Sequence, residues 1–333
     1  MKKIILTGDR PTGPLHIGHL FGSLENRVKM QEEYETYILV ADVQALTDNF
    51  TTPERVRDNV KNVVLDNLAA GIDPEKTNIV IQSLVPEIAE LTVFFSNLVT
   101  IARLERNPTV KTEIAQKKDV FKGGVTFGFL GYPVSQAADI LAFQADVVPV
   151  GEDQLPMIEQ TREIARKFNN TYGDTFKEPE AIVPEDTSRV KGLDGGEKMG
   201  KSLDNAIFIS DTEEEISRKI MGAVTDTKKI KKDDKGRPEV CTVYSYHEIF
   251  SKDELGTITK ECKAGKRGCV DCKKQLIKNV VEYLNPLQER RRKYEEDPEL
   301  VKDIINQGLK KGRDKAKETM DMVREKMKIN YDL

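Results

Sequence analysis

The stretch Thr7-Gly-Asp-Arg-Pro-Thr-Gly-Pro-Leu-His-Ile-Gly-His19 joins the first strand-like run of the chain to its first long helical pattern. Where a glycine-rich turn follows a strand and opens a helix, backbone N–H groups and the helix dipole favour a bound anion. The glycines let the backbone approach a phosphate, and His16 and His19 are expected on one face of the helix start. This segment predicts a phosphate-binding turn, but taken alone it also fits a glycine-rich turn with two surface histidines.

Outward from this turn, short β-branched runs alternate with helical patterns. Strands are expected at residues 3–6, 36–41, 78–82 and 145–150, and helices at residues 17–32, 52–70 and 86–98. Strands that alternate with helices predict a parallel sheet. After about Ser210, strand-like runs become scarce and charged helical patterns take over. We therefore predict an α/β domain with a parallel sheet over residues 1–205 and an all-helical domain over residues 206–333.

The composition is that of an ordinary globular protein, and its 333 residues allow about two domains. Lys and Arg number 52 against 56 Asp and Glu, and the net charge of −4 argues against indiscriminate nucleic-acid binding but leaves room for a local basic face. No apolar run approaches the ~20 residues of a membrane-spanning helix, and no signal-peptide pattern is present. We expect a cytoplasmic protein with no membrane partner.

A second phosphate-handling motif is Lys198-Met-Gly-Lys-Ser202, in a loop rich in Gly and Asp. Two lysines three residues apart on a mobile loop can fold over a polyphosphate and withdraw with it. By itself, a solvated lysine pair is the better interpretation. Together with His16 and His19 upstream, it completes a nucleotide signature whose two halves occur in the expected order and structural contexts.

These two motifs resemble the HIGH and KMSKS signatures of class I aminoacyl-tRNA synthetases, with Gly200 in place of the usual Ser. The resemblance implies a Rossmann-like catalytic domain over residues 1–205, with His16, His19, Lys198 and Lys201 as catalytic residues. The resemblance assigns Asp153 to the ATP site, and the alternative role for this residue is to cap the N-terminus of a helix. The residues that the resemblance assigns to ATP are Arg10, Pro11, Thr12, Gly18, His19, Gly151, Glu152, Asp153, Val190, Lys198, Met199, Gly200, Lys201 and Ser202.

Residues 41–47, 132–141 and 148–154 are similar to the corresponding segments of bacterial tryptophanyl-tRNA synthetases, although Gln44 stands where that family usually has His. The resemblance implies that Asp139 accepts the indole N–H of tryptophan, and that Tyr132, Gln136 and Gln154 surround the amino group. Asp139 lies in an apolar helical run, where a carboxylate must find donors. An indole N–H is one such donor, and a nearby Arg or Lys is the alternative. A hydrogen-bond test of this kind rejects phenylalanine without an editing domain.

The implied reaction is attack of the tryptophan carboxylate on the α-phosphate of ATP. The nucleophile is already anionic, so this step needs alignment and charge stabilisation rather than a general base. Both signature motifs and Mg²⁺, held chiefly by the triphosphate, are expected to supply that stabilisation. The tryptophanyl-adenylate then passes tryptophan to the 3′ end of tRNA-Trp. The family also implies a homodimer.

The cysteines follow the spacing Cys241-x20-Cys262-x6-Cys269-x2-Cys272. Four thiolates can hold zinc or a [4Fe–4S] cluster. A single Cys-x-x-Cys pair favours iron–sulfur, and the chain resembles the subset of tryptophanyl-tRNA synthetases with such a cluster in the helical domain; zinc and unligated thiols are the alternatives. Basic residues around the cysteines predict tRNA anticodon contacts, against the usual interpretation of a solvated helix face. They are Lys263, Lys266, Arg267, Lys273 and Lys274, with further basic runs at residues 228–232 and 290–293.

Two other function classes remain. A small-molecule nucleotidylyltransferase also uses a His-x-Gly-His turn, but that class leaves the lysine motif and the basic helical region unexplained. A non-catalytic RNA-binding regulator descended from a synthetase is disfavoured because both signature motifs retain their His and Lys residues.

Overall fold

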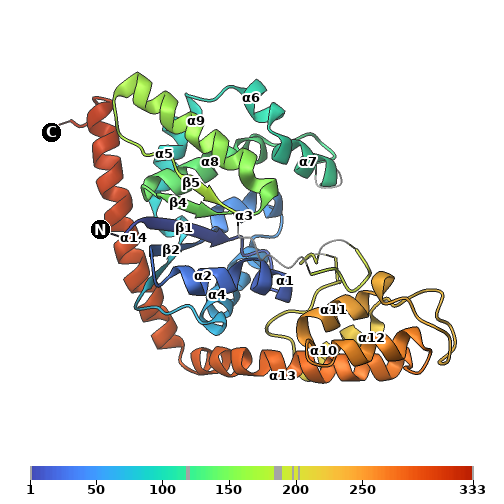
Figure 1. Cartoon of the computed structure of the whole chain (residues 1–333). Helices are drawn as coiled ribbons and strands as arrows, with labels where there is room; N and C mark the ends of the chain where they lie inside the picture. Colours follow the sequence, from blue (N-terminus) through green and yellow to red (C-terminus); the bar gives the residue numbers. More distant parts are fainter. Residues whose placement is uncertain (1, 118–120, 184–189, 197–198, 202, 332–333) are drawn as a thin grey trace.

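A five-stranded sheet forms the centre of the N-terminal part of the chain (Figure 1). The computed structural model describes residues 2–117, 121–183, 190–196, 199–201 and 203–331. The strands are β1 (Ile4–Asp9), β2 (Glu35–Val40), β3 (Thr77–Ile81), β4 (Val147–Pro149) and β5 (Glu180–Ile182), in the order β3-β2-β1-β4-β5. Every pair of neighbouring strands is parallel, which confirms the predicted parallel sheet.

Four of the strands lie where the β-branched runs predicted them, with ends shifted by a few residues. Strand β5 was not predicted, because it has only three residues and no fully buried side chain and so lacks a strong apolar pattern. Consecutive residues of a strand point to opposite faces. In β2, Leu39 belongs to the core on one face of the sheet and Val40 to the core on the other.

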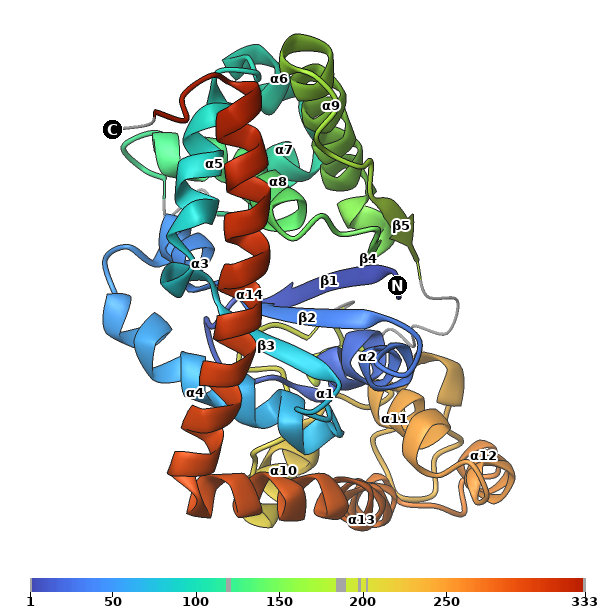
Figure 2. The same cartoon turned by 90° about the vertical axis from the view of Figure 1, so that its left-hand side faces the viewer.

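Helices cover both faces of the sheet (Figures 1 and 2). The core on one face includes side chains of α5, α8 and α9, whereas that on the other includes side chains of α1, η1 and α4. Helices α4 and α5 begin with Pro at the first helical turn, at two of the predicted helix starts. The helices up to β5 are α1 (Ile17–His19), η1 (Leu20–Leu24), α2 (Glu25–Met30), α3 (Asp42–Asn49), α4 (Pro53–Ala70), η2 (Gln82–Leu84), α5 (Pro86–Ser96), α6 (Ile101–Arg106), α7 (Pro108–Gln116), α8 (Phe127–Ala142), η3 (Glu152–Gln154) and α9 (Leu155–Tyr172).

The helical pattern predicted over residues 17–32 is three consecutive segments rather than one α-helix. Its middle segment, η1, is a π-helical turn that directly follows His19. Such a turn widens the helix locally, and π turns are frequent at functional sites. The apolar spacing of the sequence does not distinguish this turn from a regular helix, because Leu20 and Leu24 are buried in either case.

The C-terminal part is helical and ends in two long helices. The elements are α10 (Glu213–Gly222), η4 (Pro238–Val240), α11 (Thr242–Phe250), α12 (Leu255–Lys263), α13 (Cys269–Glu296) and α14 (Pro298–Lys326). Helix α13 packs on α4, α10 and α11, and α14 returns to run along the edge strand β3 (Figure 2). A Cβ atom built on Gly308 of α14 lies 2.3 Å from the backbone oxygen of Ile79, so only glycine permits this close approach. No helix in the described part of the chain is long and apolar enough to cross a membrane.

Candidate active site

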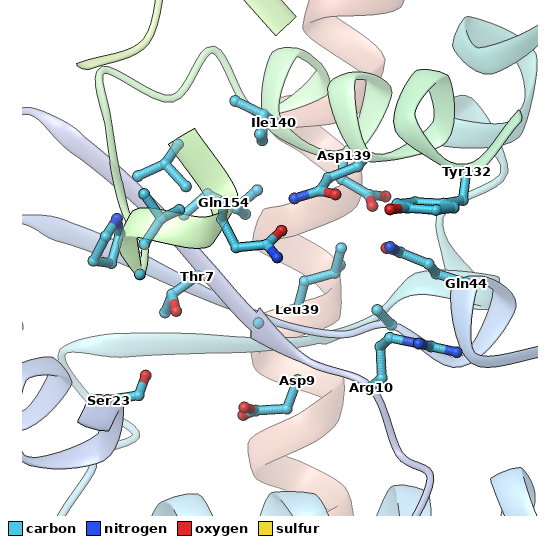
Figure 3. A pocket seen from close by; sticks show the side chains of 18 of the residues that line it. Thr7, Asp9, Arg10, Ser23, Leu39, Gln44, Tyr132, Asp139, Ile140 and Gln154 are labelled. Carbon is cyan, nitrogen blue, oxygen red and sulfur yellow. The ribbon is translucent and has the colours of Figure 1, made fainter. Parts of the chain in front are cut away.

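A cavity of about 370 Å³ opens at the carboxyl ends of β1 and β4, where the strand order reverses from one side of β1 to the other. Ligands of open parallel sheets bind at such a crevice. All four residues predicted to bind tryptophan line this cavity: Tyr132, Gln136, Asp139 and Gln154. Arg10 and Gly151, predicted to bind ATP, line it too. Figure 3 shows Asp139, Tyr132 and Gln154 on one side of the cavity, with Asp9 and Arg10 on the opposite side.

Asp139 is buried in α8, with 3% of its surface exposed. The side-chain nitrogen of Gln82 donates to Asp139 Oδ1 at 2.7 Å. Burial raises the pKa of Asp139 to about 8, and the negative charge of Asp42 acts in the same direction, whereas the Gln82 hydrogen bond opposes the rise. The described partner of this carboxyl is therefore an amide rather than an Arg or Lys, and the carboxyl retains capacity to accept a further hydrogen bond.

Separate hydrogen bonds and ion pairs hold the polar side chains in and beside this cavity. Gln82 also accepts a hydrogen bond from the backbone N–H of Gln44, at 3.0 Å, so one side chain joins α3 to α8. The Tyr132 hydroxyl donates to Glu113 at 3.3 Å. Arg10 forms an ion pair with Asp48. These contacts fix the side chains that a bound amino acid would meet.

His16 and His19 lie side by side, with ring centroids 3.8 Å apart, which confirms that they share one face of the helix start. The backbone N–H of His16 donates to His19 Nδ1 at 3.2 Å. Burial, aided by the charge of Lys201, lowers the pKa of His16 to about 4, and burial also lowers the pKa of His19. Both rings are therefore neutral at physiological pH. A Cβ atom on Gly18 would lie 2.8 Å from the His16 ring, so this glycine makes room for the histidine.

Lys201 lies over the phosphate turn. Its Nζ donates to the backbone oxygen of Arg10 at 3.1 Å, and its stem packs against Gly13. Burial lowers the pKa of Lys201 to about 8, although the nearby carboxylate of Asp9 acts in the opposite direction. The structure thus brings the second half of the lysine motif onto the first motif. Lys198 and Ser202 lie outside the described residues.

The other residues predicted for ATP occupy different surroundings. Thr12 closes a turn by donating its backbone N–H to Arg10, at 2.9 Å. Gly151 also lines a smaller cavity of about 110 Å³ beside the first. The remaining predicted residues divide by exposure: Pro11, Val190 and Met199 are buried, Gly200 is half-buried, and Glu152 and Asp153 are exposed in η3.

The ion pair between Asp9 and Arg27, two residues that line the main cavity, was not predicted from the sequence. Arg27 Nη1 lies 2.5 Å from Asp9 Oδ2, and both side chains are more than nine-tenths buried. Burial alone would raise the pKa of Asp9, but the guanidinium outweighs it and the pKa is lowered. No local pattern marks Arg27. Gln82, also missed, is the last residue of the predicted third strand and directly follows the observed β3, and the rule that ligands bind at the carboxyl ends of parallel strands could have selected it.

The four cysteines line one small pocket in the C-terminal part, together with Asp226, Lys229 and Arg267. Cys241 immediately precedes α11, Cys262 lies in α12, and Cys269 and Cys272 lie in the first turn of α13. Burial raises the pKa of the Cys272 thiol to about 12. Among the described residues, no group of three or more His, Cys, Asp or Glu side chains is placed to hold a metal ion.

The basic residues predicted to contact tRNA fall into two groups. Lys263, Lys266 and Lys274 are exposed. Arg267 instead pairs with Glu261 at 2.8 Å, and the Nζ of Lys273 donates to the backbone of Met221 at 2.8 Å. Only the first group is plainly available to a partner. In the further basic runs, Lys229 and Arg291 are buried, so the prediction of a tRNA contact is wrong for these two residues.

Residues 2–285 match the family described as "tRNA synthetases class I (W and Y)". The chain is 50% identical to the tryptophan–tRNA ligase of Lactococcus lactis, with 99% of each chain covered. It is 49% identical to that of Clostridium longisporum, covering 99% of this chain and 98% of the relative. Its fold is similar to the crystal structure of tryptophanyl-tRNA synthetase from Campylobacter jejuni complexed with ADP and tryptophan, with a TM-score of 0.87, 33% identity and coverage of 98% and 99%.

Proposed function

The chain belongs to the class I tRNA synthetases of the tryptophan and tyrosine group, and from this premise we propose that it is a tryptophan–tRNA ligase. It activates L-tryptophan with ATP to tryptophanyl-adenylate and pyrophosphate, and then transfers tryptophan to the 3′ end of tRNA-Trp. The observation that carries the proposal is one cavity that holds the buried Asp139 and adjoins the turn with His16 and His19. Full-length similarity to tryptophan–tRNA ligases supports the same choice of amino acid.

We assign the selection of tryptophan to Asp139. Its carboxylate, held by Gln82, accepts the indole N–H, and an analogue without that donor leaves a buried acceptor unpaired. Tyr132, Gln136 and Gln154 surround the amino group in this proposal. What supports the assignment is that all of these side chains except Gln82 line the same cavity.

In adenylate formation, we propose that the two neutral histidines donate hydrogen bonds to phosphate oxygens. Lys201, already placed over the turn, meets the charge that develops on the triphosphate, and Lys198 shares this role. Arg10, Gly18 and Gly151 belong to the ATP site in this proposal, together with the other residues that the signature motifs assign to it. Magnesium accompanies the triphosphate and neutralises part of its charge.

We propose that residues 206–333 form a domain that binds the anticodon end of tRNA-Trp, and that residues 1–205 form the catalytic domain. The exposed lysines Lys263, Lys266 and Lys274 support this role, because phosphate contacts supply much of the affinity for nucleic acids. Family membership further supports a homodimer that works in the cytoplasm. Sedimentation of the purified protein would test the homodimer.

We also propose that Cys241, Cys262, Cys269 and Cys272 hold a [4Fe–4S] cluster, with zinc as the alternative. A zinc ion binds each thiolate sulfur at ~2.3 Å, so the four sulfur atoms lie close to one another. In a four-iron cluster each thiolate binds a different iron atom, so the sulfur atoms lie further apart. What supports a bound group is that all four cysteines line one pocket, and the single Cys-x-x-Cys pair favours iron–sulfur over zinc. When bound, the cluster cross-links three segments. Lys229 and Arg267 beside the pocket offset its negative charge.

ATP–pyrophosphate exchange with each of the twenty amino acids tests the proposed function. We expect tryptophan alone to support rapid exchange, and the purified protein to charge tRNA-Trp. Exchange with tyrosine but not tryptophan would contradict the amino-acid assignment. Nucleotidyl transfer to a small molecule without any amino-acid-dependent exchange would favour the nucleotidylyltransferase instead.

A further inference from the structure

Asp66 of α4 is a completely buried carboxylate outside the cavity, and its two oxygens hold different parts of the chain. Its Oδ2 accepts from the backbone N–H of Leu15 at 2.7 Å, and its Oδ1 accepts from Nε of Arg291 at 2.9 Å. Leu15 immediately precedes His16 in the phosphate turn. Burying a charge is costly unless it is paired, so these bonds define where the three groups lie.

Arg291 lies near the end of α13 and is also buried, with 7% of its surface exposed. Its Nη2 donates to the side chain of Asn62 at 3.0 Å, and its Nη1 pairs with Glu295. The neighbouring Arg290 donates to the backbone oxygen of Ala69 at 2.8 Å. The end of α13 is therefore fastened to α4 around Asp66, and the guanidinium cannot move without breaking several hydrogen bonds.

The same turn has a second support that reaches α13. The backbone N–H of Ile209 donates to the oxygen of Leu15 at 3.0 Å, and the backbone N–H of Ile17 donates to Ile207 at 2.9 Å. Gln288 of α13 in turn donates to the backbone oxygen of Ile209 at 3.0 Å. The phosphate turn with His16 and His19 is thus held between α4 and residues 207–209. Both of these segments are hydrogen-bonded to α13.

We propose that Asp66 and Arg291 are positioning residues for adenylate formation: the hydrogen-bonded chain Arg291–Asp66–Leu15 sets the position of His16. The inference rests on the proposed synthetase function. Without the Asp66 carboxylate, the buried N–H of Leu15 loses its acceptor and the turn shifts to find another. A displacement of about 1 Å at a reacting group can lower a rate on the order of 100-fold. Helix α13 thereby becomes a support of the active site although it contributes no side chain to the cavity.

Substitution of Asp66 and Arg291 tests the proposal. In Asp66→Asn, the amide oxygen accepts one donor while its NH₂ group opposes the other. We expect Asp66→Asn and Arg291→Met to lower kcat for pyrophosphate exchange by roughly 10- to 100-fold. The KM for tryptophan should stay within about twofold, because neither residue lines the amino-acid cavity. Arg291→Lys keeps one charged donor for Asp66 and should recover part of the lost rate.

Glu90→Gln is the matched control. Glu90 pairs with Arg324 and likewise ties a C-terminal helix, α14, to the sheet domain, but it lies away from both signature motifs. We expect wild-type kcat for this variant. All variants are compared well below their melting temperatures, because a merely stabilising role lowers the melting temperature without changing the rate of the folded enzyme. Wild-type kcat in folded Asp66→Asn and Arg291→Met would overturn the proposal, as would equal losses in Glu90→Gln.

Amide hydrogen exchange provides a readout that does not need catalysis. The peptide containing Leu15 should lose protection in Asp66→Asn and Arg291→Met but keep it in Glu90→Gln. If this peptide keeps its protection in Asp66→Asn and Arg291→Met, the proposal is overturned. If the wild-type protein shows no tryptophan-dependent exchange, the synthetase function fails, and the protection of Leu15 still decides whether Arg291 and Asp66 hold the turn.

Discussion

The histidine turn and the cysteine pocket both gather residues from segments that are distant in the sequence, but they are held together differently. In the turn, hydrogen bonds from α4 and from residues 207–209 fix the backbone on both sides of His16. In the pocket, burial raises the pKa of Cys241, Cys262 and Cys272, and no described metal-binding group is formed. Backbone hydrogen bonds thus fix the first site, whereas shared burial is what joins the cysteines of the second.

The largest effect on pyrophosphate exchange is expected for Lys201→Ala. Loss of one preorganised charge that meets the transition state lowers kcat by roughly 100- to 1,000-fold. The KM for tryptophan should change little, because Lys201 does not line the amino-acid cavity. Steady-state exchange kinetics give both quantities. Lys191→Ala, an exposed lysine of the same loop, is the control, and an equal loss of rate and tryptophan affinity in Lys201→Ala would contradict the proposed role.

The next effect concerns the selection of tryptophan. Asp139→Asn replaces a charged acceptor by a neutral amide, and we expect kcat/KM for tryptophan to fall on the order of 10- to 100-fold. The preference for tryptophan over phenylalanine should narrow, because phenylalanine has no indole donor to lose. Exchange assays with both amino acids measure this. Wild-type discrimination by the variant would mean that the carboxylate serves only the contact with Gln82.

The raised pKa of Asp139 predicts that the KM for tryptophan depends on pH. Its pKa of about 8 in the free protein means that the carboxyl holds a proton at lower pH, whereas the indole N–H is bound best by the ionised form. The KM for tryptophan should therefore fall as pH rises towards about 8, by at most roughly tenfold per pH unit, and then level off. The KM of Asp139→Asn should lack this dependence. A wild-type KM that rises with pH over this range would contradict the assignment.

The smallest effect on exchange is expected at the cysteine pocket. Anaerobically purified protein should be brown, with about four irons and acid-labile sulfide per chain, and Cys269→Ser should lose the colour. Exchange should stay within about twofold, because the cysteine pocket and the active-site cavity share no lining residue, whereas charging of tRNA-Trp should fall. Iron analysis and parallel exchange and charging assays measure these outcomes. Stoichiometric zinc without iron would exclude the cluster, and equal losses of exchange and charging would exclude a separate role for the pocket.

Local patterns predicted much of the fold and the centre of the site. The β-branched runs located four strands, and the histidine spacing placed two rings together. The buried Asp139 was predicted from its apolar surroundings, but its partner Gln82 lies 57 residues away and shares no motif with it.

Ion pairs between residues far apart in the chain could not be predicted from the sequence. Asp66 and Arg291 are separated by 225 residues, and neither stands in a pattern that marks it as buried. The second half of α4 is buried all around because α13 covers the side that would otherwise face water. An amphipathic pattern describes a helix with one neighbouring surface, so such a tertiary contact remains invisible until the chain is folded.

The close contact between α14 and β3 has a consequence for synthesis on the ribosome. Strand β3 is an edge strand, and an uncovered edge is a template for pairing with other chains. The glycine that lets α14 cover this edge, Gly308, is translated long after Ile79, which it contacts. At ~5–20 residues per second, the edge stays open for roughly 11 to 46 s while the intervening chain is made. During that interval the uncovered edge is open to pairing with other chains, and a chaperone that shields β3 would act before the last helix emerges.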